Sequence, residues 1–112
     1  MATTKTEVSD MLVTVKSREI QRGMLAAIRK DARAARRHFL AAAHLELVLA
    51  DDYDQAGQEV LALRSQLSAA SCFWRGGQRE RARALLEQLV QNHPAQADEI
   101  QQVEVELERN RG

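Results

Sequence analysis

From about residue 17 onward, the apolar residues recur at intervals of three and four, the spacing that places side chains on one face of an α-helix. The first such series predicts one long helix over residues 17–50. Gly23 lies inside it at a cost of about 1 kcal/mol relative to alanine, which need not break the helix. The series consists of Leu25, Ile28, Ala32, Ala35, Phe39, Ala42, Ala43, Leu47 and Ala50.

Turn-forming residues divide the rest of the chain into three further helices, over residues 55–75, 78–92 and 95–109. Residues 51–54 (Asp-Asp-Tyr-Asp) are expected to form the first turn, with Asp54 as the N-cap of the next helix. Gly76 and Gly77 end that helix, because glycine suits the left-handed conformation found at helix C-termini. The side chains expected to face inward on the helix over 55–75 are Val60, Leu63, Leu67, Ala70 and Trp74.

The first sixteen residues carry mixed signals. Thr4 and Glu7 have the spacing of a capping box, whereas residues 11–15 (MLVTV) resemble a short strand. A lone strand has nothing to pair with, so we expect residues 1–16 to be a loosely ordered N-terminal segment or a frayed helical turn. Residues 17–112 then form a single helical domain. The predicted fold is all-α, a four-helix antiparallel arrangement with two long helices and a shorter helical pair.

Charge and composition indicate the cellular compartment of the protein more clearly than its function. Sixteen basic and sixteen acidic residues cancel, but residues 29–37 hold five positive charges against one negative, and residues 98–108 hold five acidic residues and no basic one. The single Cys72 excludes an internal disulfide and fits a reducing compartment. No apolar run approaches the roughly 18 residues of a membrane span, and the N-terminus lacks the apolar core of a signal peptide. We therefore expect a cytoplasmic protein that does not enter a membrane.

The residues that carry chemistry do not combine into a catalytic or metal site. His38 and His44 are six residues apart, which places them on opposite faces of a helix. His93 lies in a turn, and one cysteine cannot supply a structural zinc site. Cys72 lies within a packed helix, where cysteine usually acts as a small apolar side chain. No glycine-rich loop follows a strand, so nothing indicates a phosphate cradle. We expect no metal, no cofactor and no enzymatic activity.

Residues 67–94 (LSAASCFWRGGQRERARALLEQLVQNHP) resemble a tetratricopeptide repeat, a pair of antiparallel helices. The resemblance covers about a quarter of the chain and implies a protein-binding scaffold. Because small residues let two helices approach closely, Ala70 and Ala82 are expected to face each other across the turn. The matching positions are Ala70, Phe73, Gly77, Ala82, Leu86, Leu89 and Pro94.

A second resemblance leads to a different function. Two long helices joined by ADDYDQA and followed by shorter ones look like the HEPN domains of bacterial toxins and nucleotide-binding proteins. Some members of that family carry Arg-x4-6-His as a ribonuclease motif, and two pairs fit this pattern: Arg33 with His38, and Arg37 with His44. The resemblance therefore implies nucleic-acid processing as the alternative function.

A continuous helix over residues 18–50 would also imply a homodimer. Its 33 residues would extend about 50 Å, whereas a compact domain of this length spans about 35 Å. The projecting end is apolar, and a second copy related by a two-fold axis could bury it. A break near Lys30 and Asp31, with Asp31 capping a new helix, would remove the projection. The expected dimer or partner surface consists of Ile20, Met24, Leu25, Ile28, Arg29, Arg33, Arg36 and Arg37.

The function that these patterns favour is protein–protein interaction, as a non-catalytic scaffold, adaptor or small chaperone-like module. Arginines on the first helix, and a second group at positions 75, 79, 81 and 83, could follow a phosphate backbone. Zero net charge and the lack of aromatic residues interleaved with the arginines disfavour nucleic acid as the partner. Pairing with the acidic residues 98–108, within one chain or between two, would account for the same charges.

Overall fold

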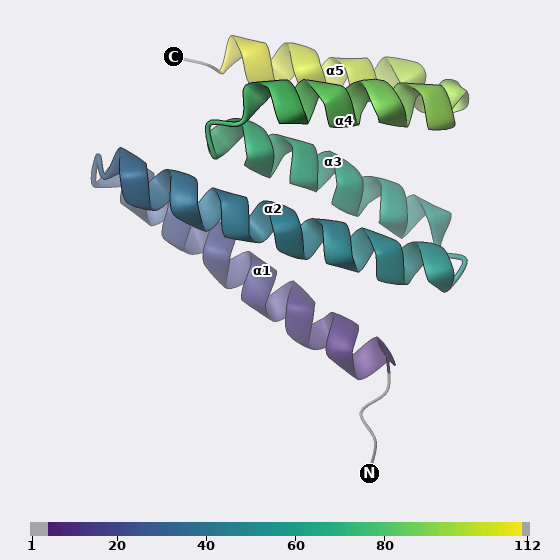
Figure 1. Cartoon of the computed structure of the whole chain (residues 1–112), viewed down its shortest axis with the longest axis horizontal. Coiled ribbons are helices and arrows are strands. Elements are labelled where there is room, and N and C mark those ends of the chain that lie inside the picture. Colours follow the sequence, from purple (N-terminus) through teal and green to yellow (C-terminus); the bar gives the residue numbers. More distant parts are fainter. Residues whose placement is uncertain (1–4, 111–112) are drawn as a thin grey trace.

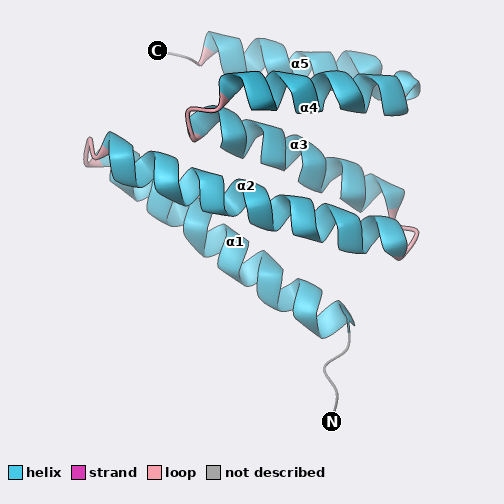
Figure 2. Cartoon of the chain, viewed as in Figure 1, coloured by secondary structure: helices cyan, strands magenta, loops and turns pink. Residues whose placement is uncertain are grey.

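The computed structural model describes residues 5–110, with side chains from Val8 onward, and this part of the chain is entirely helix and short turns (Figure 2). The predicted all-α class is confirmed, but the described residues form five α-helices where four were expected. They are α1 (Lys5–Ile28), α2 (Ala32–Gln55), α3 (Glu59–Arg75), α4 (Arg79–Asn92) and α5 (Ala97–Arg109), with a 3-10 turn at Pro94–Gln96 before α5.

The helices form a thin array of 45 × 36 × 16 Å, in which each helix packs mainly against its neighbour in the sequence (Figure 1). In addition, α3 contacts α5. The α1–α2 turn, the α3–α4 turn and the C-terminal end of α5 lie at the same side of the array, on the left in Figure 1. Segments that are far apart in sequence therefore meet at one end of the molecule.

Three of the helix–helix turns share one hydrogen-bond pattern, in which a residue with positive φ follows the helix. After α1, Lys30 N–H donates to the Ala27 carbonyl at 3.0 Å, and Asp31 N–H donates to the Ala26 carbonyl at 2.9 Å. This pair of bonds is the Schellman motif, which satisfies carbonyls that the helix end leaves free. The same bonds close α2 at Gly57 and α3 at Gly77, so the predicted glycine stop after α3 is observed.

The predicted continuous helix over residues 17–50 is wrong. Helix α1 ends at Ile28 and the chain reverses direction, because Lys30 adopts the left-handed conformation with φ of 61°. Asp31 then caps α2, accepting a hydrogen bond from Ala34 N–H at 3.1 Å. The break near Lys30 that was considered as the alternative is thus the observed structure. The projecting helix end that suggested a homodimer does not exist, and the homodimer stays a prediction without that geometric support.

Residues 5–16 belong to α1, so the expectation of a loosely ordered segment over 1–16 does not hold for them. Contacts with α2 explain the difference: Ser9 Oγ donates to Asp52 Oδ2 at 3.5 Å, and Lys16 Nζ lies 3.5 Å from Glu46 Oε2. Folding α1 back onto α2 supplies the packing partner that the sequence alone did not reveal. Residues 1–4 lie outside the described part.

The turn between α2 and α3 also differs from the prediction. Residues 51–54 are the last turn of α2, and Asp54 is not an N-cap, because the chain reverses later, at Gly57 with φ of 74°. Val60 consequently lies in the first turn of α3 and is 68% exposed, although it was expected to face inward. A glycine that adopts positive φ without strain decides the position of the turn here, against a run of acidic residues that could also have formed one.

Small side chains bring the helices of the core close together. Ala42, Ala43, Ala69 and Ala82 are fully buried around Phe73. Gly23 of α1 has the same role at the α1–α2 contact, because a Cβ atom there would lie 3.0 Å from the ring of Phe39. A second cluster contains Ala70, Leu86, Leu89 and Ile100. Ala70 and Ala82 thus pack in separate clusters, and their direct contact stays a prediction.

The left-handed conformation at Lys30 leads to a stability prediction. A residue with a Cβ atom is strained there by about 1–2 kcal/mol, and glycine is not, although glycine loses more chain entropy on folding. Lys30→Gly is therefore expected to raise the free energy of unfolding by about 1 kcal/mol in urea denaturation. Lys30→Ala keeps the Cβ atom and is the matched control. Equal effects of the two substitutions would contradict the observed turn.

Candidate binding groove

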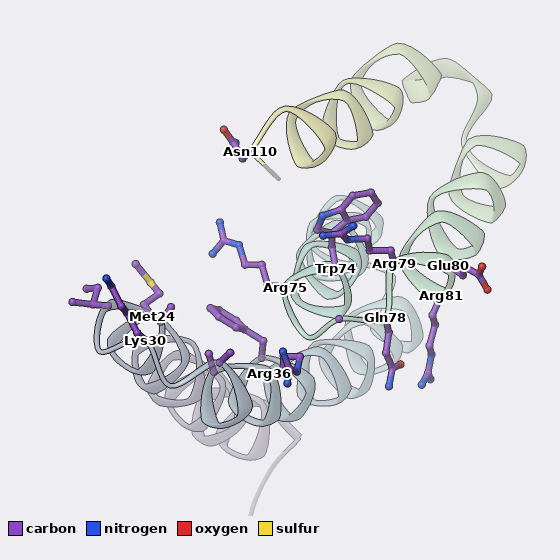
Figure 3. A pocket seen from close by; sticks show the side chains of 16 residues that line it. Met24, Lys30, Arg36, Trp74, Arg75, Gln78, Arg79, Glu80, Arg81 and Asn110 are labelled. Carbon is purple, nitrogen blue, oxygen red and sulfur yellow. The ribbon is translucent and has the colours of Figure 1, made fainter. Parts of the chain in front are cut away.

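An open groove with a volume of about 1380 Å³ lies where the α1–α2 turn, the α3–α4 turn and the end of α5 meet (Figure 3). Arg75 extends from the end of α3 into the space between the α1–α2 turn and Asn110, the residue that follows α5. The apolar part of the lining consists of Met24, Ala27, Ile28, Ala32, Ala35, Phe39 and Trp74.

The polar lining of the groove is strongly cationic, although the chain as a whole has zero net charge. Among the described residues of the lining, Glu80 is the one acidic side chain. Within residues 8–110, no carboxylate lies within 4.0 Å of the charged nitrogens of any lining cation. Among the described residues, these charges therefore have no carboxylate partner. The lining cations are Lys30, Arg36, Arg75, Arg79 and Arg81.

Aromatic rings hold three arginines at or beside the groove in place. The guanidinium carbon of Arg75 lies 5.6 Å from the centroid of the Phe39 ring, and that of Arg79 lies 5.4 Å from the Trp74 ring. The guanidinium carbon of Arg81 lies 4.2 Å from the centroid of the Phe73 ring. Stacking of this kind fixes a planar guanidinium while its N–H groups remain free to meet an acceptor.

The rings beneath the arginines belong to the core. Phe39 is 5% exposed and Trp74 is 6% exposed, so neither ring presents a free face. The exposed apolar surface of the groove comes instead from α1, where Met24 is 49% exposed and Ile28 is 77% exposed. These two residues are four positions apart and lie on the same side of the helix. The groove thus combines a flexible aliphatic wall with ordered cations.

The start of α4 adds to the positive potential. Gln78, Arg79, Glu80 and Arg81 all line the groove, and the Gln78 side chain makes no capping hydrogen bond. The first N–H groups of a helix carry a partial positive charge, equivalent to about half an elementary charge for the whole terminus. The partial charge at the N-terminus of α4 and the net charge of the nearby side chains are therefore both positive at this end of the molecule.

The eight residues expected to form the binding surface are only partly brought together. Met24, Ile28 and Arg36 line the groove. Ile20 packs against the core, whereas Leu25 is exposed beside the groove lining and not part of it. The remaining residues of the set are also exposed and lie outside the lining: Arg29, Arg33 and Arg37.

The α3–α4 turn was not part of the binding surface expected from the sequence. Arg75, Arg79 and Arg81, grouped with Arg83, were considered as contacts to a phosphate backbone or as partners of the acidic residues 98–108. Their proximity to Met24 and Ile28 depends on the reversal at Lys30, which brings the end of α1 beside the α3–α4 turn. A search for basic residues flanking predicted turns would have marked these arginines, but not their neighbours from α1.

Neither Arg–His pair of the proposed ribonuclease motif lines the groove. His38 Nδ1 lies 2.7 Å from Glu19 Oε2, and this contact joins α2 to α1. The His44 ring meets the ring of Phe73 edge-on, with centroids 5.4 Å apart. Arg33 and Arg37 are exposed. Each histidine thus has a contact that belongs to helix packing.

The remaining titratable groups within the core also serve packing. Burial raises the pKa of the Cys72 thiol to about 11, which keeps it protonated and unreactive at neutral pH. The side chain of Glu46 is 3% exposed and pairs with Lys16 of α1. This buried carboxylate was not expected from the sequence, because Glu46 fits an ordinary helical pattern. Within the described residues, no group of three or more His, Cys, Asp or Glu side chains is placed to hold a metal ion.

No helix among residues 5–110 is long and apolar enough to cross a membrane. Comparisons of the chain with protein-family models, with curated proteins and with solved structures find no match. The interpretation of the groove therefore depends on its own geometry and charge.

The contact between Glu19 and His38 predicts a pH-dependent contribution to stability. The hydrogen bond from His38, with a smaller effect of Arg22, lowers the pKa of Glu19 below its ordinary value of 4.5. Because the folded-state pKa is the lower one, this stabilisation is present above pH 4.5 and is lost as the pH falls through the folded-state value. Glu19→Gln is expected to lower the free energy of unfolding by about 1 kcal/mol at neutral pH.

Urea denaturation at a series of pH values measures this effect, and the difference between Glu19→Gln and the unchanged protein is expected to shrink below pH 4.5. Glu106→Gln, at an exposed position of α5, is the control for the loss of one carboxylate. A difference that stays constant over the whole pH range would show that Glu19 contributes through packing alone.

Proposed function

We propose that the chain is a non-catalytic protein-interaction module that docks a partner protein in the groove between the α1–α2 and α3–α4 turns. One observation carries the proposal: five cations surround an apolar wall and have no carboxylate partner among the described residues. Surface arginines and an exposed aliphatic patch are both features of protein-binding sites. The resemblance of residues 67–94 to a tetratricopeptide repeat supports the same class of function.

The groove favours a protein over a nucleic acid as the partner. Proteins that bind single strands offer exposed aromatic faces on which bases stack. Here the rings of Phe39 and Trp74 are buried beneath arginines, and the exposed apolar side chains are the aliphatic Met24 and Ile28. The proposed setting is the cytoplasm, in line with a single cysteine that has no partner for a disulfide within the chain.

Site-specific photo-crosslinking in cells tests the proposal. A photoreactive residue at Ile28, inside the groove, is expected to give discrete adducts that protease digests and nuclease leaves intact. The matched control is Val60, an aliphatic residue of similar exposure in the first turn of α3, at the opposite end of that helix from the α3–α4 turn. Adducts at position 28 should be lost when Arg75→Glu reverses one of the groove charges, since the partner then meets repulsion.

Three outcomes of this experiment are informative. Adducts at position 28 that require Arg75 and are absent at position 60 support docking in the groove. Equal labelling at both positions would contradict the proposal, and so would adducts that nuclease removes. An adduct of twice the chain mass would identify a second copy as the partner and would support the predicted homodimer.

A further inference from the structure

Resting on the proposed function, we infer that the occupant of the groove is an acidic, amphipathic segment of a partner protein, whose carboxylates pair with the groove cations and whose apolar side chains contact Met24 and Ile28. Charge complementarity is the first ground. The groove lining holds five cations and one acid in a chain of zero net charge. The excess is therefore a local feature of this surface.

Arg83, which lies outside the groove lining, differs from the groove cations because it has carboxylate partners. Arg83 follows Arg81 on α4, and its guanidinium contacts Glu108 and lies 3.8 Å from Glu104, both on α5. The contact with Glu108 raises the pKa of Arg83 above its ordinary value. The charge of Arg83 is therefore neutralised by carboxylates of α5. Among residues 8–110, the five groove cations have no carboxylate partner of this kind.

The chemistry of the cations indicates carboxylate ligands. Four of the five are arginines, whose planar N–H groups match the two oxygens of a carboxylate. Arg75 and Arg79 are held on buried aromatic rings, so binding orders fewer side chains than it would on a surface of free lysines. A segment with several carboxylates can engage more than one of these arginines at once.

The aliphatic wall sets a second requirement on the occupant. Met24 and Ile28 are exposed four residues apart on α1, and together they border the cationic side of the groove. A purely acidic segment would leave this wall in water, whereas one that alternates acidic and large apolar residues covers it. Methionine is a flexible side chain that adapts to apolar partners of different shape.

The test measures the binding of fluorescent peptides of equal length by anisotropy. One peptide places Glu and Leu on opposite faces of a helix, a second replaces every Glu by Gln, and a third replaces every Glu by Lys. A single-stranded oligonucleotide is the fourth probe. The Glu peptide is expected to bind about tenfold more tightly than the Gln peptide, with an affinity that falls as salt rises.

Two charge-matched variants locate the binding. The triple variant Arg75→Gln, Arg79→Gln and Arg81→Gln removes three groove cations and is expected to weaken binding of the Glu peptide by about tenfold. Its control replaces three exposed arginines outside the groove by glutamine: Arg18, Arg33 and Arg64. The control variant has the same net charge and is expected to bind the Glu peptide as the unchanged protein does. Circular dichroism and thermal denaturation of both variants verify the fold.

Each failure has its own meaning. Equal affinity for the Glu and Gln peptides, lost on changing Met24→Ser and Ile28→Ser, would keep the groove as a docking site and overturn its preference for acidic partners. Tightest binding of the oligonucleotide through the groove arginines would overturn the inference and the proposed function together. Equal weakening by the two triple variants would show that net charge alone drives the binding, which also overturns the inference.

Discussion

The reversal of the chain at Lys30 determines the rest of the structure. The apolar pattern on either side of it would continue through a single helix, and only a residue in the left-handed conformation turns α1 back onto α2. The reversal places Gly23 against Phe39 and the end of α1 beside the α3–α4 turn. Without it, the groove would lack its aliphatic wall and the cations of α3 and α4 would border open solvent.

The groove cations, which have no carboxylate partner among residues 8–110, are compatible with a stable fold because they stay at the surface, where water screens them. Stacking on Phe39, Phe73 and Trp74 stabilises the guanidinium groups without neutralising them. The same rings fill the core, so one set of aromatic side chains contributes to folding and also orders the arginines at and beside the groove. The positions of the groove arginines therefore follow from the helices that bury the rings.

The sequence predicted the helical class, the glycine stop at Gly77 and the helix that follows, because each depends on local spacing or on a residue with a distinct backbone preference. It favoured a continuous helix, with the break near Lys30 only as the alternative, and it did not predict the later turn at Gly57. Lysine gives no local sign of a left-handed conformation, and the aspartates before Gly57 fit both a turn and a helix end. The groove could not be predicted, because it joins segments whose proximity depends on these two reversals.

The central claim, that an uncompensated positive potential fills the groove, can be measured through the reactivity of an introduced thiol. Ile28→Cys and Val60→Cys place a thiol at two exposed positions, one in the groove and one in the first turn of α3, and the buried Cys72 remains unreactive. The rate of reaction with a doubly negative aromatic disulfide is compared with that of a neutral one. The account predicts a higher anionic-to-neutral rate ratio at position 28 than at position 60, and the difference should disappear at high salt. Equal ratios at the two positions in low salt would contradict it.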